Sequence, residues 1–169
     1  MIILLVDGYN IIGDWEELKR LRDKDMAQAR DLLMEYMADY QAFTGTKVII
    51  VFDAHESPGK GSKLKHRGVD IIYTKEHETA DERIERLIKK LKNVKTQVYV
   101  ATSDYTEQRT IFAQGALRIS ARELKLELQE MKYEIDTHLS EQSKRKPQAK
   151  ITDDPELLEK LERMRRGES

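Results

Sequence analysis

Continuous apolar runs alternate along this chain with stretches of helical periodicity. A short run that is apolar at every position predicts a buried strand, because a parallel sheet covered on both faces has no polar side. Residues 2–6 form such a run, and residues 47–54, 69–74, 97–102 and 117–119 are four more runs that are mostly apolar. The pattern therefore predicts an α/β fold built around a mostly parallel sheet.

Helical patterns fill the intervals between these runs. Apolar side chains recur at helical spacing over residues 26–40, and Gly45 stands where that helix would end. Thr79 and Glu82 have the spacing of a capping box, which predicts the start of a second helix. A third helix is expected around residues 105–114, and a loop is expected between the second and third strands. Helices on both faces would give a three-layer α/β/α domain.

The last part of the chain has a different character. A capping box at residues 120–123 begins another predicted helix, but residues 143–150 are polar and basic and contain a proline. Residues 153–166 then read as a short helix. A C-terminal helical tail is therefore expected after about residue 140.

Composition narrows the setting of this domain. The chain has no cysteine, which excludes a disulfide partner and a Cys-based zinc site and fits a reducing, cytoplasmic location. The apolar runs are too short to cross a membrane, and the N-terminus lacks the features of a signal peptide. With 30 Lys and Arg against 31 Asp and Glu, the net charge is -1, so binding to a polyanion would depend on local basic patches.

Acidic residues mark one edge of the predicted sheet. Asp7 ends the first apolar run, Asp53 ends the second, Asp104 follows the fourth, and Asp81 lies in the first turn of the helix after the third. Carboxyl ends of parallel strands meet at one edge, so four mutually repelling charges are expected there. A hard cation, Mg²⁺ or Mn²⁺, would relieve that repulsion.

Each acidic residue also has a purely structural interpretation. Asp104 can cap a helix, Asp81 can interact with a helix dipole, and Asp53 can cap a turn. Asp7 fits such a role least well, because it follows an uninterrupted apolar run and has Asn10 one turn further on.

Four short motifs carry a resemblance to a known family. They are DGYN at 7–10, VFDA at 51–54, TADERIE at 79–85 and ATSD at 101–104. In this order and spacing they resemble the NYN-domain nucleases of the PIN-like superfamily, above all the YacP-like branch. That branch includes a ribosome-associated endoribonuclease that cuts mRNA in the A site. The resemblance covers residues 1–140 and leaves residues 141–169 as a basic linker and C-terminal helix.

The resemblance implies a function and a set of site residues. Asp7, Asp81 and Asp104 would be the catalytic, metal-binding positions, with Asn10 and Asp53 in support. The implied reaction is attack of metal-activated water on a phosphodiester of mRNA, in association with the ribosome. Two alternatives remain open: a non-catalytic RNA-binding or ribosome-binding adaptor on the same fold, and a phosphatase-like domain with an aspartate nucleophile. The latter would favour Asp-x-Asp after the first strand, where this chain has Tyr between Asp7 and Asn10.

A basic loop at residues 59–68 is the candidate surface for RNA. Its basic residues are Lys60, Lys63, Lys65 and Arg67, with no acidic residue among them. It leaves the same edge as Asp53 and could bind phosphates, although an ordinary solvated surface has the same composition. Tyr9, at the exit of the first strand, is the candidate for stacking on a base.

Overall fold

The structure is a computed structural model of the chain and describes residues 1–56, 61–104, 111 and 114–150. It contains a six-stranded sheet with the order β3-β4-β2-β1-β5-β6. The strands are β1 (Ile2–Asp7), β2 (Lys47–Phe52), β3 (Lys63–His66), β4 (Val69–Tyr73), β5 (Gln97–Ala101) and β6 (Leu117–Ile119). All neighbouring strands are parallel except β3 and β4, which confirms the predicted mostly parallel α/β sheet.

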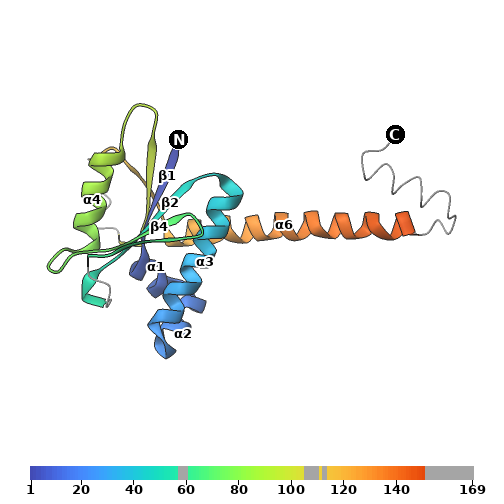
Figure 1. Cartoon of the computed structure of the whole chain (residues 1–169), viewed down its shortest axis with the longest axis horizontal. Helices are drawn as coiled ribbons and strands as arrows, with labels where there is room; N and C mark the ends of the chain where they lie inside the picture. Colours follow the sequence, from blue (N-terminus) through green and yellow to red (C-terminus); the bar gives the residue numbers. More distant parts are fainter. Residues whose placement is uncertain (57–60, 105–110, 112–113, 151–169) are drawn as a thin grey trace. The chain divides into compact units, whose positions relative to one another are not determined.

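Helices cover both faces of the sheet, as predicted (Figure 1). Helix α4 (Ala80–Leu91) lies on one face, and α1 (Gly8–Asp14), α2 (Glu16–Lys24) and α3 (Met26–Thr44) lie on the other. The predicted helix ends are confirmed: Thr79 caps α4 by accepting a hydrogen bond from Glu82 N, and Gly45 ends α3 with φ of 75°. The sequence pattern identified α3 but missed α1 and α2, which are too short to show a clear period.

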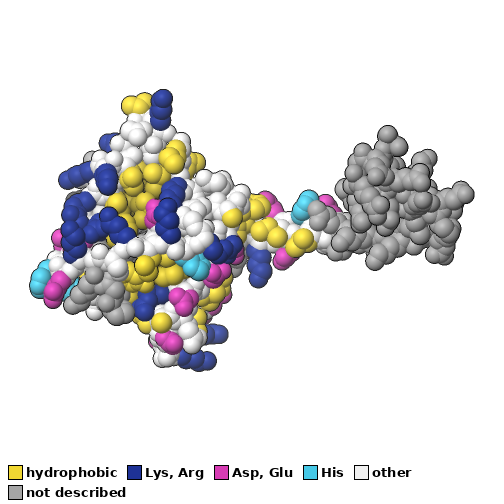
Figure 2. Space-filling model, in the orientation of Figure 1, with side chains coloured by type: hydrophobic (Ala, Val, Ile, Leu, Met, Phe, Trp, Pro, Cys, Tyr) yellow, Lys and Arg dark blue, Asp and Glu magenta, His cyan; other side chains and the backbone are white. Residues whose placement is uncertain are grey.

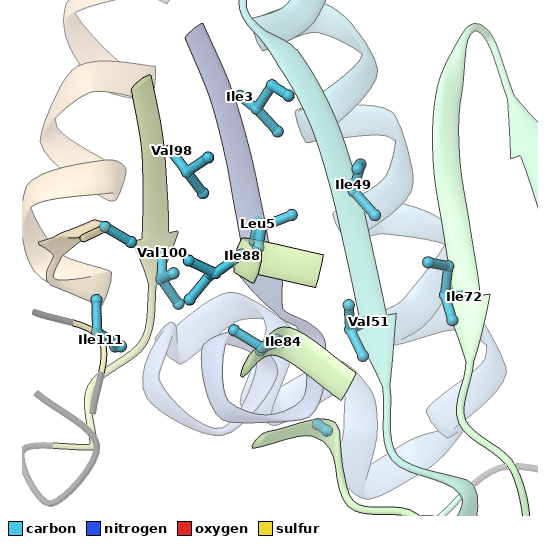
Figure 3. Close-up of a cluster of buried hydrophobic side chains, with 12 residues drawn as sticks. Ile3, Leu5, Ile49, Val51, Ile72, Ile84, Ile88, Val98, Val100 and Ile111 are labelled. Carbon is cyan, nitrogen blue, oxygen red and sulfur yellow. The ribbon is translucent and has the colours of Figure 1, made fainter. Parts of the chain in front are cut away.

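The core between α4 and the sheet explains why the central strands are largely apolar. Figure 3 shows Ile84 and Ile88 of α4 above side chains of β1, β2, β4 and β5. Leu5 and Val100 are fully buried there, and the opposite side of each strand is covered by the other helical layer. Each such side chain contributes on the order of 1.5–3 kcal/mol of burial energy. The energy of this core fixes the strand ends, and with them the acidic residues.

The prediction that only a loop joins β2 and β4 was wrong. After the short 3₁₀ helix η1 (Ala54–Glu56), residues 63–66 form β3, an edge strand paired antiparallel with β4. Its sequence, KLKH, has only one apolar residue, so the hydrophobic pattern gave no sign of a strand. Charged edge strands are common because lysines discourage pairing with another chain.

Helix α6 (Ala121–Lys150) follows β6 and begins at the predicted capping box, where Glu123 N donates to Ser120 Oγ. Trp15 Nε1 donates to the Ala121 carbonyl oxygen at 2.8 Å, and Tyr40 donates to Glu127 at 2.7 Å. These bonds tie the start of α6 to the layer of α1, α2 and α3.

The chain divides into two compact units, Met1–Gln129 and Glu130–Ser169, and α6 continues through residue 140. The division expected at residue 140 stays a prediction. Most of the helix expected at 105–114 and all of the one at 153–166 lie outside the described residues. None of the helices in the described part of the chain is both long and apolar enough to span a membrane.

Candidate active site

Three carboxylates act electrostatically on a fourth, Asp7, at the carboxyl end of β1. Asp7 is the last residue of this strand, which lies between β2 and β5, and it is only 8% exposed. Burial raises the pKa of the Asp7 carboxyl to about 7, and the negative charges of Asp81, Asp104 and Asp53 raise it as well. The structure therefore places Asp53, Asp81 and Asp104 within electrostatic range of Asp7, at the edge where the sequence predicted them.

Thr102 links two members of this cluster. Its hydroxyl donates to Asp7 Oδ2 at 3.4 Å and accepts a hydrogen bond from the backbone N–H of Asp104 at 3.1 Å. The bond to Asp7 lowers the pKa of that carboxyl and so opposes the effect of burial. Thr102 thereby orients Asp7 and fixes the turn that carries Asp104.

Asp53 connects the cluster to the start of α4. One of its carboxylate oxygens accepts from His55 N at 2.9 Å, and the other accepts from Ala80 N at 3.3 Å. The second bond holds the first residue of α4 immediately before Asp81. Asp53 therefore combines the predicted turn role with a place in the acidic cluster.

Asn10 has a fixed amide orientation. Its Oδ1 accepts hydrogen bonds from Ser103 N at 2.6 Å and from Ser103 Oγ at 2.8 Å. A backbone N–H can only donate, so the amide oxygen must face Ser103 and the NH₂ group must face away. That NH₂ group makes no hydrogen bond to any described residue, and it remains a donor for a ligand.

Gly8 and Tyr9 turn the chain from β1 into α1. A Cβ on Gly8 would lie 2.4 Å from Cε1 of Phe52, so only glycine allows this close approach. The Tyr9 ring packs on Phe52 with centroids 4.9 Å apart, and its hydroxyl accepts from Arg30 Nη1 at 3.2 Å. Tyr9, predicted to stack on a base, is thus anchored at the site and half exposed.

The basic residues predicted to bind RNA are spread along the β3–β4 hairpin. Lys63 pairs in register with Ile72, near the carboxyl end of β4, and is exposed. Lys65 lies 3.6 Å from Asp70. Figure 2 shows Lys and Arg side chains gathered over α4 and this hairpin, around exposed hydrophobic surface.

Arg67 and Lys60 differ from the other two. Arg67 lies in the turn at the amino edge of the sheet, away from Asp7, and donates to Glu35 at 2.9 Å and Asp39 at 3.0 Å on α3. Its position on this edge gives it a structural contact that the sequence did not reveal. Lys60 lies outside the described residues.

The donor chemistry of the cluster fits a hard cation. Carboxylate oxygens are the ligands that Mg²⁺ and Mn²⁺ prefer, and a partly protonated Asp7 is a group that a cation would compete for. In the ranges that the structure describes, however, no three Asp, Glu or His side chains already lie close enough together to hold a metal ion. The arrangement fits a cation bound by one or two carboxylates together with the phosphate of a substrate.

Three residues at this edge were missed by the sequence pattern. Thr102 and Ser103 belong to the ATSD motif, but a hydroxyl residue before an Asp reads as an ordinary turn or cap. Arg30 lies on a helix whose exposed side carries many charges, so nothing in the sequence distinguishes it from a solvated residue.

Comparison with known proteins places the chain among close relatives. It is 51% identical over 168 residues to the uncharacterized protein YacP of Bacillus subtilis, and the alignment covers 99% of both chains. The crystal structure of Rae1 (YacP) from the same organism has a TM-score of 0.76 at 51% identity, covering 99% of this chain and 96% of that one. A point mutant of Rae1 has a TM-score of 0.75 at 48% identity, covering 94% and 89%.

The family match covers the same length. Residues 4–166 match the YacP-like NYN domain. NYN domains are typically nucleases, and they are usually metal-dependent. From the full-length identity and this match together, the chain belongs to the family of YacP-like NYN domains.

Proposed function

We propose that the chain is a metal-dependent endoribonuclease that cleaves mRNA in association with the ribosome. The observation that carries this proposal is the buried carboxyl of Asp7 at the end of β1, on which the charges of Asp53, Asp81 and Asp104 all act. A fold gains no stability from placing four carboxylates together, because like charges repel. The cluster is therefore best explained by a cationic ligand.

Asp7, Asp81 and Asp104 are the candidate ligands for Mg²⁺ or Mn²⁺, of which one or two at a time would hold the cation together with the phosphate of the substrate. The bound cation would polarise a phosphoryl oxygen and lower the pKa of a water that attacks phosphorus. Thr102 keeps the Asp7 carboxylate in one orientation, and Asp53 holds the helix start that carries Asp81. None of these roles requires a nucleophilic side chain.

Other residues would bind and orient the RNA. The NH₂ group of Asn10, turned away from Ser103, is a donor for a phosphate oxygen beside Asp7. Lys63 is exposed on the hairpin and is available to a more distant phosphate. The net charge of -1 gives the chain no general attraction to RNA, which favours a partner such as the ribosome that presents the mRNA.

The test is cleavage of a reporter mRNA by purified protein, with and without translating ribosomes, in Mg²⁺ or in EDTA. We expect cleavage that needs the metal and is strongest on ribosomes. Asp7→Asn should lower the rate on the order of a hundredfold or more, the cost of losing a group that acts on the transition state. Asp14→Asn, the same change at an exposed position in α1, is the matched control and should cleave normally.

Two results would change the assignment. Cosedimentation with ribosomes but no cleavage by the wild type, under any metal condition, would favour the adaptor. Equal rates for wild type and Asp7→Asn at saturating substrate would remove Asp7 from the catalytic set.

A further inference from the structure

Arg30 lies at the same edge of the sheet as the acidic cluster but on its other face. Helix α3 leads into β2 at the amino edge, so the first turns of α3, including Arg30, lie at the carboxyl edge. Its guanidinium donates to the hydroxyl of Tyr9, two residues after Asp7, at 3.2 Å. It also lies near the hydroxyl of Tyr73, the last residue of β4, and its positive charge lowers the pKa of that hydroxyl against the effect of burial. Tyr9 therefore holds this cation beside the site, close to Tyr73.

No acidic residue in the described part of the chain compensates the charge of Arg30. The side chain is half-buried, and it forms no ion pair with any residue that the structure describes. Asp31, the next residue of α3, acts electrostatically on Tyr73 but makes no ion pair with Arg30. Tyr73 offers no negative charge, because burial raises the pKa of its hydroxyl above the usual value.

A half-buried cation without an anionic partner is costly, and arginine has more donors than one tyrosine can use. The guanidinium carries five N–H groups in a planar fork that matches a phosphate in geometry and charge. The bond to Tyr9 uses one of these N–H groups and fixes the direction of the fork. The remaining N–H groups are suited to an anion that arrives from solvent.

We propose that Arg30, positioned by Tyr9, binds a backbone phosphate of the RNA strand next to the phosphate held at the acidic cluster. The inference rests on the proposed function, since it places a substrate strand across the carboxyl edge of the sheet. Tyr9 lies between the two sites in sequence and in space, because it follows Asp7 and contacts Arg30. The strand would pass over Tyr9 from one face of the sheet to the other.

The alternative is a structural tie, in which Arg30 only links α3 to the start of α1 through Tyr9. The two interpretations differ in what they predict. A tie contributes to stability and does not change the salt dependence of RNA binding. A phosphate contact contributes to the salt dependence, because each neutralised phosphate on a single strand adds about 0.7 to the slope of log K against log salt.

The experiment measures binding of a labelled single-stranded oligoribonucleotide of about 12 nucleotides, within the site sizes of roughly 4–16 seen for single-strand binders. The full chain is used in EDTA, so that no cleavage occurs, over a series of salt concentrations. Arg30→Gln should weaken binding about tenfold at low salt, as expected for a charged hydrogen bond, and lower the slope by about 0.7. Arg30→Lys should recover the slope but only part of the affinity, because lysine lacks the planar fork.

Lys95→Gln is the matched control, since Lys95 is exposed in the segment before β5, at the amino edge. Arg30→Gln and Lys95→Gln with equal affinities and slopes would overturn the inference, as would a wild type that does not bind the oligonucleotide at low salt. Cleavage by the wild type with unaffected Arg30 variants would overturn this inference alone. Binding that depends on Arg30, without any cleavage, would support it and overturn only the proposed nuclease activity.

Discussion

Two buried carboxylates stand near the same edge of the sheet in opposite surroundings. The side chain of Glu78, between β4 and α4, is 12% exposed and accepts hydrogen bonds from Arg83 Nη2 at 2.8 Å and Nε at 3.1 Å. Arg86 forms a second ion pair with it. Asp7 is also buried, but the charges that act on it are those of other carboxylates.

The difference separates a charge that serves the fold from one that serves a ligand. Removing an ion from water costs several kcal/mol unless another charge compensates it. The chain compensates Glu78 with its own arginines, and the pair holds the first turns of α4, where Asp81 lies. It leaves Asp7 to be compensated by a proton or a cation from solvent. The ion pair of Glu78 and Arg83 therefore helps to position Asp81, which belongs to the acidic cluster around Asp7.

The largest effect on stability is expected at Glu78. Glu78→Gln leaves Arg83, whose side chain is 9% exposed, without its partner charge. Breaking a buried pair in this way should lower the free energy of unfolding by about 3–5 kcal/mol. Urea denaturation followed by circular dichroism measures this change.

Glu82→Gln is the control for Glu78→Gln, because it makes the same change in the exposed capping box of the same helix. We expect it to be nearly neutral. A second variant, Glu78→Gln with Arg83→Met, should recover part of the loss, since it also removes the stranded cation. Equal stabilities for Glu78→Gln and Glu82→Gln would show that the buried pair does not hold α4.

The second effect is a pH dependence that comes from Asp7. Its pKa is about 7 in the folded chain against the usual 3.8, so between these values the folded state binds a proton that the unfolded state does not. Without metal, this group should therefore make the protein more stable as the pH falls from about 7 to about 4, by at most a few kcal/mol. Unfolding in EDTA at several pH values measures it. Asp7→Asn should lose this contribution and be more stable than wild type at pH above 7. If the free energy of unfolding of Asp7→Asn depended on pH as steeply as that of wild type, or more steeply, the assignment to Asp7 would be wrong.

The third effect is stabilisation by a divalent cation. A cation that binds only the folded state adds RT ln(1 + [L]/Kd), about 2.7 kcal/mol at a hundredfold excess over Kd. Millimolar Mn²⁺ or Mg²⁺ should raise the melting temperature of wild type, and Asp7→Asn and Asp104→Asn should gain less at matched ionic strength. If wild type shows no shift and both variants simply melt lower in EDTA, a cation site without RNA is excluded, and only a cation that arrives with the substrate phosphate remains.

The sequence predicted the acidic cluster because its members follow directly from strand ends. Once Asp7 and Asp53 end parallel strands, their meeting at one edge is a consequence of topology. Asp81 and Asp104 were predicted for the same reason, from the helix start and strand end that precede them. The same logic could not reveal the role of Glu78. Its burial depends on the position of α4, from which Arg83 donates a hydrogen bond to the Glu78 carboxylate.

The hairpin shows the limit of the same logic. A strand with two lysines, one leucine and one histidine carries no hydrophobic signal, because an edge strand needs only one neighbour and can remain exposed. The sequence therefore placed Lys63 and Arg67 in one loop, whereas the hairpin puts them at opposite edges of the sheet. Position within an antiparallel pair is set by register, and register was not readable from these residues.

The smallest expected effect distinguishes the lysines of this hairpin. Lys63 lies near the carboxyl edge and has no ion pair with a described residue, Lys65 is already paired with Asp70, and Arg67 is bound to α3 at the amino edge. RNA binding at low salt should weaken a few-fold for Lys63→Gln, with a salt slope lower by about 0.7, and less for Lys65→Gln. Arg67→Gln should leave binding unchanged and serves as the control for charge alone. Equal losses of affinity in all three variants would mean that only net charge matters. If none of the variants lost affinity, the hairpin would be an ordinary solvated surface. The phosphate contacts of this chain would then have to lie at the acidic cluster and at Arg30.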